Sequence, residues 1–274
     1  MSATWALSNL CDSLIVLRRE DCDLYLEYPQ HYILKLIELS SGYIRDTNSH
    51  LCIKVNCLRS IGCLLLCCES ISVDENDVEV NEVLENGIKC IIDCIREHSS
   101  MKIRWNACYA ASKVVLNENL TKYLNKIIVA IVAVLKSCKN YKVRINALSV
   151  LLNVESRAVL GGEYTALVMA ILDGIDGLNA LEDLDETMHK LELIESSCLA
   201  LCHMALLSTS NDLKTIAPLV SNDQIERIEH MLINAKKRIS PEKASVFMEA
   251  YSFIREKKIH EEEALGTFFR ALAE

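Results

Sequence analysis

The sequence predicts an all-α protein that folds as an α-solenoid, a stack of about five helical hairpins. The first observation is a helical pattern that returns at a spacing of roughly forty to fifty residues, at 52–63, 101–117 and 142–153. Each copy holds a cation, an apolar residue, an asparagine and a small residue, followed by an apolar run at helical spacing. In addition, the 274 residues include only 8 Gly and 3 Pro, and no segment shows the alternation of a strand.

The helices are expected to follow one another through short polar turns. They cover 2–18, 31–43, 51–69, 82–98, 101–116, 121–138, 141–154, 163–175 and 188–208. Pro29 suits the first turn of the second helix, an acidic loop is expected at 73–81, and the glycine pair at 161–162 breaks the chain. Connections of a few residues leave only antiparallel packing for each pair of helices.

The last part of the chain is expected to be helical as well. A capping box at 221–224 opens a helix that runs to 237, and Ser240 with Pro241 opens the helical segment that ends near 273. We interpret 1–274 as a single repeat domain, regular over about 2–160 and more divergent over 161–274. The first helix has no partner helix before it, so we expect either an internal start at Met1 or the C-terminal part of a longer solenoid.

Composition limits the classes of function. The net charge is −9, which argues against nucleic acid as a partner because the phosphate backbone needs a basic face. Most of the 13 cysteines lie in apolar helical runs, where a free thiol acts as a small hydrophobic group, so we expect a reducing intracellular compartment, cytoplasm or nucleus. No leader is expected, and the longest uncharged apolar run, 61–68, is too short to span a membrane.

Two segments concentrate charge. The segment 173–195 carries a net charge of −7, and 236–258 carries a net charge of +4. Both are expected to be solvated helix or loop surfaces. The alternatives are that the acidic segment is an electrostatic contact for a basic partner, and that the basic segment touches acidic protein, RNA or anionic lipid.

Aligning the copies of the repeated helix gives columns of equivalent residues. The small column is Ala3, Cys57, Ala107 and Ala147, where neighbouring helices approach closely. The other structural columns hold three cations and three asparagines: Lys54, Arg104, Arg144 and Asn56, Asn106, Asn146.

These columns resemble the second helix of HEAT repeats, in the stretches that begin at Ile103 and Val143. In that family an Asp three residues before the apolar residue pairs with the Arg and forms a ladder between repeats. Here that position holds His50, Ser100 and Asn140, so the resemblance implies a neutral, hydrogen-bonded ladder made by the cation and asparagine columns. The order of the segments over about 2–160 resembles the C-terminal part of a longer HEAT repeat-containing protein.

The resemblance also implies that the second helices line a concave face. Polar, aromatic and long side chains recur there at two columns, four residues apart, and we call the following six the second-helix row: Trp5, Asn9, Arg59, Tyr109, Lys113 and Asn153. Trp5 and Asn9 also resemble the Trp-x-x-x-Asn element with which armadillo repeats of importin-alpha-like proteins bind basic nuclear signals. The other second helices do not repeat that element.

No pattern of residues predicts catalysis. The sequence lacks phosphate loops, nucleophile elbows and zinc-protease motifs, and the carboxylates at 183–186 lie on an expected loop without an apolar pocket. The cysteine pairs 90/94 and 198/202, although one helical turn apart, lack the close spacing of zinc sites and are expected in the core.

We therefore expect a non-catalytic scaffold that binds a protein or peptide along the concave face, with no cofactor, metal or small-molecule substrate. The alternative is a nuclear-transport adaptor that binds basic peptide signals.

Overall fold

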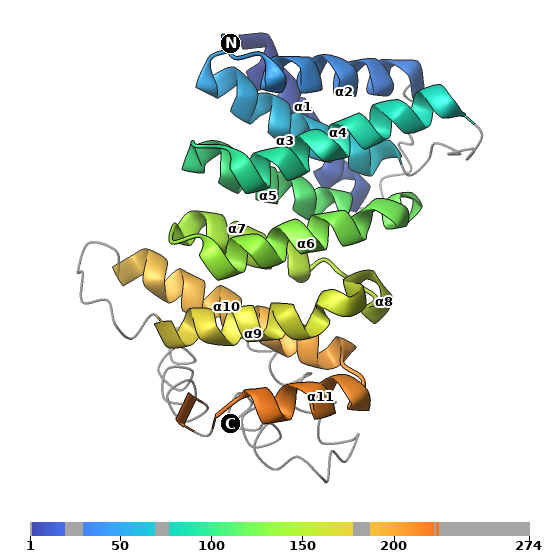
Figure 1. Cartoon of the computed structure of the whole chain (residues 1–274). Coiled ribbons are helices and arrows are strands. Elements are labelled where there is room, and N and C mark those ends of the chain that lie inside the picture. The colour runs from blue at the N-terminus through green and yellow to red at the C-terminus, as the bar shows by residue number, and fades with distance from the viewer. Residues whose placement is uncertain (1, 20–29, 69–76, 178–186, 222, 225–274) are drawn as a thin grey trace. The chain divides into compact units, whose positions relative to one another are not determined.

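The computed structural model describes residues 2–19, 30–68, 77–177, 187–221 and 223–224. Every regular element in these ranges is helical, which confirms the all-α prediction there (Figure 1). The chain divides into two compact units, residues 1–131 and 132–274. Pro29, the loop at 73–76, the carboxylates at 183–186 and the helical segments expected at 225–237 and 241–273 lie outside the described residues.

The described part of the first unit contains five whole α-helices and the start of a sixth. They are α1 (Ser2–Arg19), α2 (Gln30–Arg45), α3 (Leu51–Cys67), α4 (Val78–Glu97), α5 (Met101–Val114) and α6 (Thr121–Ser137), which continues into the second unit. These bounds agree with the expected helices to within a few residues, except at the start of α4.

Helix starts follow from short polar side chains. The His50 side chain accepts a hydrogen bond from the Cys52 N–H at 3.2 Å and begins α3. The Asp77 side chain accepts a hydrogen bond from the Val80 N–H at 3.1 Å and begins α4 at Val78, although a loop was expected as far as residue 81. This correction has a simple cause: an Asp at the N-cap satisfies a free N–H and lies at the positive end of the helix dipole.

In the first unit, the odd-numbered helices form one layer and the even-numbered helices form the other. Helix α3 packs against α1 and α5 within its layer and against α2 across it, while α4 packs against α2 and α5 (Figure 1). Leu58, Ile61 and Leu65 of α3 are completely buried, and burial of each such side chain stabilises the fold by about 1.5–3 kcal/mol. Gly62 permits the close approach of α3 and α5, because a Cβ there would lie 2.6 Å from the Cα of Ala110.

The second unit holds α7 (Tyr141–Leu151), α8 (Arg157–Leu160), α9 (Tyr164–Asp176), α10 (Thr187–Leu207) and α11 (Ser210–Ile216). Helix α10 packs against α7 and α9, and α11 packs against α9. The predicted break at the glycine pair is confirmed, since Gly161 has φ +50° and separates α8 from α9. Helices α8 and α11 were not predicted, because four and seven residues are too few to show helical periodicity.

Within the part of the chain that the structure describes, one stretch, 157–176, is long and apolar enough to cross a membrane by length and composition alone. It is divided by the short 3-10 turn Gly161–Glu163. In α9 the side chains of Leu167, Ile171 and Ile175 are buried within the second unit. Burial of this kind is what a core helix of a packed helical unit shows.

Candidate functional site

The most distinctive polar site of the first unit surrounds the carboxylate of Asp12 in the middle of α1. Trp5, Asn9 and Asp12 lie at intervals of four and three residues, so they share one face of this helix. The adjoining face, with Ser8, Cys11 and Ile15, is buried. Because α1 packs on α3, its polar face borders α3, and Asp12 on this face also reaches Tyr109 of α5.

Three side chains from α3 and α5 point their donors at this carboxylate. Arg59 of α3 forms an ion pair and hydrogen bond with Asp12. The Tyr109 hydroxyl of α5 donates to Asp12 Oδ1 at 3.1 Å, and the Cys63 thiol donates to the same oxygen at 3.6 Å. A single carboxylate on α1 thus links two other helices.

Two cations lie close to the aromatic ring of Tyr109. The Lys113 Nζ is 4.9 Å from the ring centroid, and the Arg59 Cζ is 5.9 Å from it. Cations at such distances are attracted to the negative face of the ring. We call Asp12, Arg59, Cys63, Tyr109 and Lys113 the Asp12 cluster. Its two cations exceed its one carboxylate.

Burial and charge set the protonation of the cluster's donors. Burial, followed by the nearby Asp12 carboxylate, raises the pKa of the Tyr109 hydroxyl well above its usual value. The same two causes raise the pKa of the Cys63 thiol. Both groups therefore keep their protons at neutral pH and act as hydrogen-bond donors rather than as nucleophiles.

The cluster is open enough for solvent to reach its charges. The side chain of Arg59 is 37% exposed and that of Asp12 is 26% exposed. Tyr109 and Lys113 are half-buried as well. Charges in such positions are screened by water more than a buried pair, so they remain available to an external group.

The structure brings together part of the second-helix row. Arg59, Tyr109 and Lys113 meet in the Asp12 cluster. On α1, Trp5 lies on the same face as Asp12 and is 61% exposed, and Asn9, between Trp5 and Asp12, is half-buried. Asn153 lies in the second unit, just after α7. That these residues contact a partner stays a prediction.

Asp12 itself was missing from the predicted row. The available signal was its position seven residues after Trp5, on the same face of α1. Its partners lie 47 and 97 residues away along the chain, and the sequence does not show which helix α1 packs against.

The hydrogen bonds of the asparagine column support single helices. Asn106 Nδ2 donates to the Lys102 carbonyl at 2.7 Å, and Asn146 Nδ2 donates to the Lys142 carbonyl at 2.8 Å, each one turn earlier in its own helix. Asn56 is half-buried at the equivalent position of α3. Bonds of this kind do not link successive repeats, so the neutral ladder between repeats is not formed by Asn106 or Asn146.

The three residues of the cation column have different surroundings. Arg104 Nε donates to the Ile95 carbonyl at 2.9 Å, within the hairpin of α4 and α5, and Lys54 is half-buried. Arg144 is 9% exposed, and its Nε has no hydrogen-bond partner among the described residues. A Cβ at Gly174 would lie 1.9 Å from Nη2 of Arg144, so the guanidinium in this position lies directly over the glycine at the C-terminal turn of α9 and would have to shift for a larger residue.

Burial lowers the pKa of Arg144 from its usual value. The partial negative charge at the end of α9 is the compensation that the helix offers to a buried cation. We interpret Arg144 as a packing residue, in line with the structural role expected for its column.

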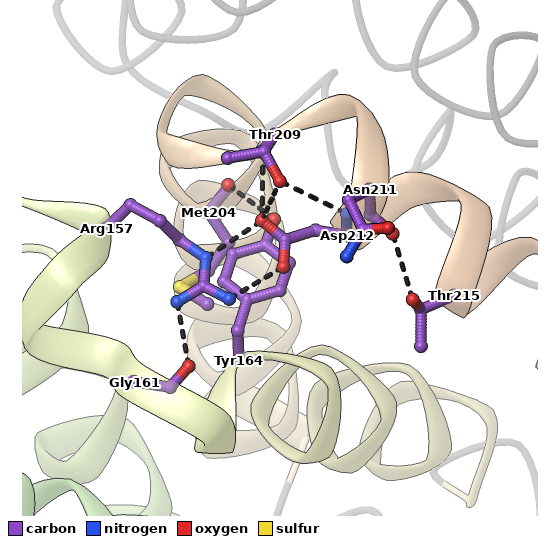
Figure 2. Close-up of polar contacts among 8 residues, drawn as sticks. All are labelled: Arg157, Gly161, Tyr164, Met204, Thr209, Asn211, Asp212 and Thr215. Atoms are coloured by element: carbon purple, nitrogen blue, oxygen red, sulfur yellow. Dashed lines mark hydrogen bonds and ion pairs between the residues drawn. The ribbon is translucent and has the colours of Figure 1, made fainter.

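A second polar site, in the second unit, is built around Asp212 at the start of α11 (Figure 2). Arg157 of α8 binds both oxygens, with Nε 2.8 Å from Oδ2 and Nη2 2.6 Å from Oδ1. Its Nη1 donates to the Gly161 carbonyl at 2.8 Å. The backbone N–H and hydroxyl of Thr209 donate to Oδ2 at 3.0 and 2.7 Å. The Asp212 N–H donates to the Thr209 hydroxyl oxygen at 3.2 Å, which completes a capping box.

Tyr164 closes this second site. Its ring lies 4.5 Å below the Arg157 Cζ, and its hydroxyl donates to the Met204 carbonyl at 2.7 Å (Figure 2). Hydrogen bonding to Arg157 lowers the pKa of Asp212 to about 2. We call Arg157, Tyr164, Thr209 and Asp212 the Asp212 cluster.

A hollow of about 440 Å³ lies between α4 and the start of α6, in the first unit. Its floor is apolar, with Ile88, Ile92 and Tyr123. Its rim carries both signs of charge, and Lys126 pairs with Glu85 at 3.2 Å. No pattern in the sequence indicates this hollow, because it is formed by helices that are not neighbours in the chain.

The described cysteines carry free thiols. Burial raises the pKa of Cys11 and Cys202 to about 12 and that of Cys57 to about 11, so these thiols are not poised as nucleophiles. Cys90, Cys94 and Cys198 are also buried. In the part of the chain that the structure describes, no group of three or more His, Cys, Asp or Glu side chains gathers as metal ligands would.

The structure describes the two charged segments only in part. In 173–195 the described side chains include Asp173, which accepts a hydrogen bond from Gln224 at 3.0 Å. Ser221 accepts from the Gln224 N–H at 3.2 Å, which is half of the predicted capping box. The basic segment 236–258 lies outside the described residues.

Comparison with known proteins finds a distant relative. An uncharacterized protein of Dictyostelium discoideum is 26% identical to this chain over 161 residues, which is 53% of this chain and 11% of that protein. The chain thus spans about a tenth of the length of this relative. No family model and no solved structure matches the chain, so the resemblance to HEAT repeats stays a prediction.

Proposed function

We propose that the chain is a non-catalytic interaction protein and that the Asp12 cluster binds an acidic segment of a partner protein. The observation that carries this proposal is the gathering of two cations, Arg59 and Lys113, at the half-buried ring of Tyr109, beside the part-exposed carboxylate of Asp12. Exposed aromatic and arginine side chains are the types that contribute most to protein interfaces.

The chemistry favours a carboxylate as the incoming group. The guanidinium of Arg59 has donors on both edges, and one edge is occupied by Asp12. The ammonium group of Lys113 lies over the ring of Tyr109 and has three donors. A Glu or Asp side chain of a partner, or a C-terminal carboxylate, would accept from both cations. Trp5 would cover an apolar residue next to it.

The wider architecture belongs to the same proposal. Within the first unit, α3 packs on both α1 and α5, and α2 packs on α4, which is the contact pattern of stacked hairpins. We propose that stacking of HEAT or armadillo type continues through the chain and that the layer with α1, α3 and α5 is the concave face. Small-angle X-ray scattering tests this proposal. An elongated particle would agree with continuous stacking, and a nearly spherical particle would contradict it.

The binding experiment compares charge removal at two places. A fluorescein-labelled Glu-rich peptide is titrated with the wild-type chain, with a double variant Arg59→Gln and Lys113→Gln, and with a matched double variant Lys89→Gln and Arg96→Gln. The control pair lines the hollow beside α4 and removes the same charge. We expect the first variant to weaken binding at least tenfold and the control to change it less than twofold. Equal effects of both pairs would mean that only net charge matters.

A second candidate is the nuclear-transport adaptor. The exposure of Trp5, with Asn9 one turn later on the same face, is the feature that favours it. A Lys-rich peptide should then bind saturably, and Trp5→Ala should abolish that binding. The cations of the Asp12 cluster disfavour this candidate, and saturable binding of the acidic peptide alone would remove it.

A further inference from the structure

Helix α2 carries a row of large apolar side chains on its exposed side. Tyr32, Leu39 and Tyr43 are 60%, 49% and 49% exposed, and Leu36 between them is half-buried. The spacing of four, three and four residues places all four on one face of the helix. We call Tyr32, Leu36, Leu39 and Tyr43 the α2 stripe.

The positions equivalent to the α2 stripe are covered on α4 and α6, the corresponding helices later in the chain. The buried residues Ile33, Ile37 and Ser40 of α2 match Leu84, Ile88 and Ile91 of α4 and Leu124, Ile128 and Ile131 of α6. In this register, Leu36 and Leu39 correspond to Gly87 and Cys90 on α4 and to Ile127 and Ala130 on α6, all of which are buried. On α4 the cover is α2 itself, since a Cβ at Gly87 would lie 2.9 Å from Cγ2 of Ile37.

Helix α1 shows the same difference from the later second helices. Ala3, Ala6 and Leu10 are exposed, with Leu10 at 54%. Their equivalents are buried: Cys57, Ser60 and Leu64 on α3, and Ala107, Ala110 and Val114 on α5. Positions that are buried on α3, α4, α5 and α6 are therefore exposed on α1 and α2, one helix in each layer of the first unit. Exposed apolar surface of this extent marks an interface.

We propose that a second copy of this chain covers the α2 stripe, with the two α2 helices packed antiparallel. The stripe reads the same in both directions, Tyr–Leu–Leu–Tyr at the same spacings. An antiparallel pair therefore sets Tyr32 against Tyr43 of the second copy and Leu36 against its Leu39. Self-complementarity of this kind is what a two-fold interface requires.

Charge does not oppose this pairing. The stripe carries no ionisable carboxylate or amine, and the neighbouring Lys35 and Glu38 pair with each other at 2.7 Å. Antiparallel packing also places the positive end of each helix dipole beside the negative end of the other. The proposal involves different residues from the Asp12 cluster, so it stands or falls separately from the proposed function.

The first test is the molar mass of the whole chain in solution. Light scattering after size exclusion, from micromolar to submillimolar concentration, should give a dimer for the wild type. Leu39→Glu should give a folded monomer with the helical content of the wild type by circular dichroism, because Leu39 is exposed within the single chain. Val78→Glu is the matched control: Val78 is 75% exposed on α4, outside the stripe, and its substitution should leave the dimer intact.

The second test fixes the orientation. Tyr32→Cys and Tyr43→Cys chains are mixed and treated with a short bis-maleimide, with the wild type as background. The mixture should cross-link and each variant alone should not, because eleven residues separate like positions by about 16 Å along the helix. A wild-type monomer at every concentration would overturn the proposal, and so would cross-linking of Tyr32→Cys to itself.

Discussion

The Asp12 and Asp212 clusters are built from the same groups and differ in what those groups leave open. Each has one carboxylate, an arginine and a tyrosine ring beside that arginine. Asp212 is 7% exposed and accepts donors from both Arg157 and Thr209, and Tyr164 donates to a backbone carbonyl. Asp12 lies at a part-exposed junction where a second cation, Lys113, is added.

The difference separates a structural ion pair from a candidate binding site. In the Asp212 cluster the charges balance and the donors and acceptors meet in short, paired bonds, so it is suited to holding α8, α9 and α11 together. In the Asp12 cluster the positive charge is in excess and solvent reaches the arginine. Buried pairs are costly to break, whereas part-exposed ones contribute little to stability, so the clusters should respond differently to the same substitutions.

The largest effect is expected from Asp212→Asn. The variant removes the charge that Arg157 needs in a buried site, so the free energy of unfolding of the second unit should fall by about 2–4 kcal/mol. Urea denaturation, with hydrogen exchange to localise the loss, measures this. Glu155→Gln removes an exposed carboxylate of the same unit and should change stability by less than about 0.5 kcal/mol. Equal losses in both variants would remove the structural role of the cluster.

The same cluster predicts a dependence on pH. The pKa of Asp212 is lowered from 3.8 to about 2 in the folded state, so its ionised form stabilises the fold above the unfolded value. That contribution, about 2 kcal/mol at neutral pH, is lost as the pH falls from about 4 towards 2. The stability difference between wild type and Asp212→Asn should therefore be constant above pH 5 and shrink below pH 4. A difference that grows on acidification would contradict the assignment.

Smaller effects should distinguish the two tyrosines. Tyr164→Phe removes a buried hydrogen bond and leaves the Met204 carbonyl unsatisfied, which costs about 1–3 kcal/mol. Tyr109→Phe removes one of several donors to a part-exposed carboxylate and should cost about 0.5–1 kcal/mol. Thermal unfolding of the two variants makes the comparison, and a larger loss for Tyr109→Phe would reverse our ranking of the clusters.

The sequence predicted the helices well because helical periodicity is a local signal. The long helices α1, α2, α3 and α6 were found to within a few residues. The helix α11 was missed because its stability comes from Asp212 and Thr209, and a seven-residue segment shows no period of its own. The role of Asp212 in binding Arg157 depends on a contact across 55 residues, which no local pattern contains.

The candidate site was predicted in part for the same reason. Column alignment placed Arg59, Tyr109 and Lys113 together, because equivalent positions of stacked helices fall on one face. It gave the asparagine column an inter-repeat role, whereas Asn106 and Asn146 bond within their own helices, as polar side chains in helix interiors often do. The position of Asp12 on the face of Trp5 was a local signal, but its pairing with Arg59 and Tyr109 depends on the packing of α1 on α3, which is a tertiary contact.

The most direct test of the central claim is the Asp12→Asn variant, studied for stability and for binding at once. If the Asp12 cluster is a binding site for acidic segments, loss of the competing carboxylate frees Arg59 and Tyr109 for the partner. The free energy of unfolding should then fall by about 1 kcal/mol, while the affinity for the Glu-rich peptide rises at least threefold over wild type. A variant that loses stability and binds the peptide no better than wild type would show that the cluster only fastens α1 to α3 and α5, and would contradict the account.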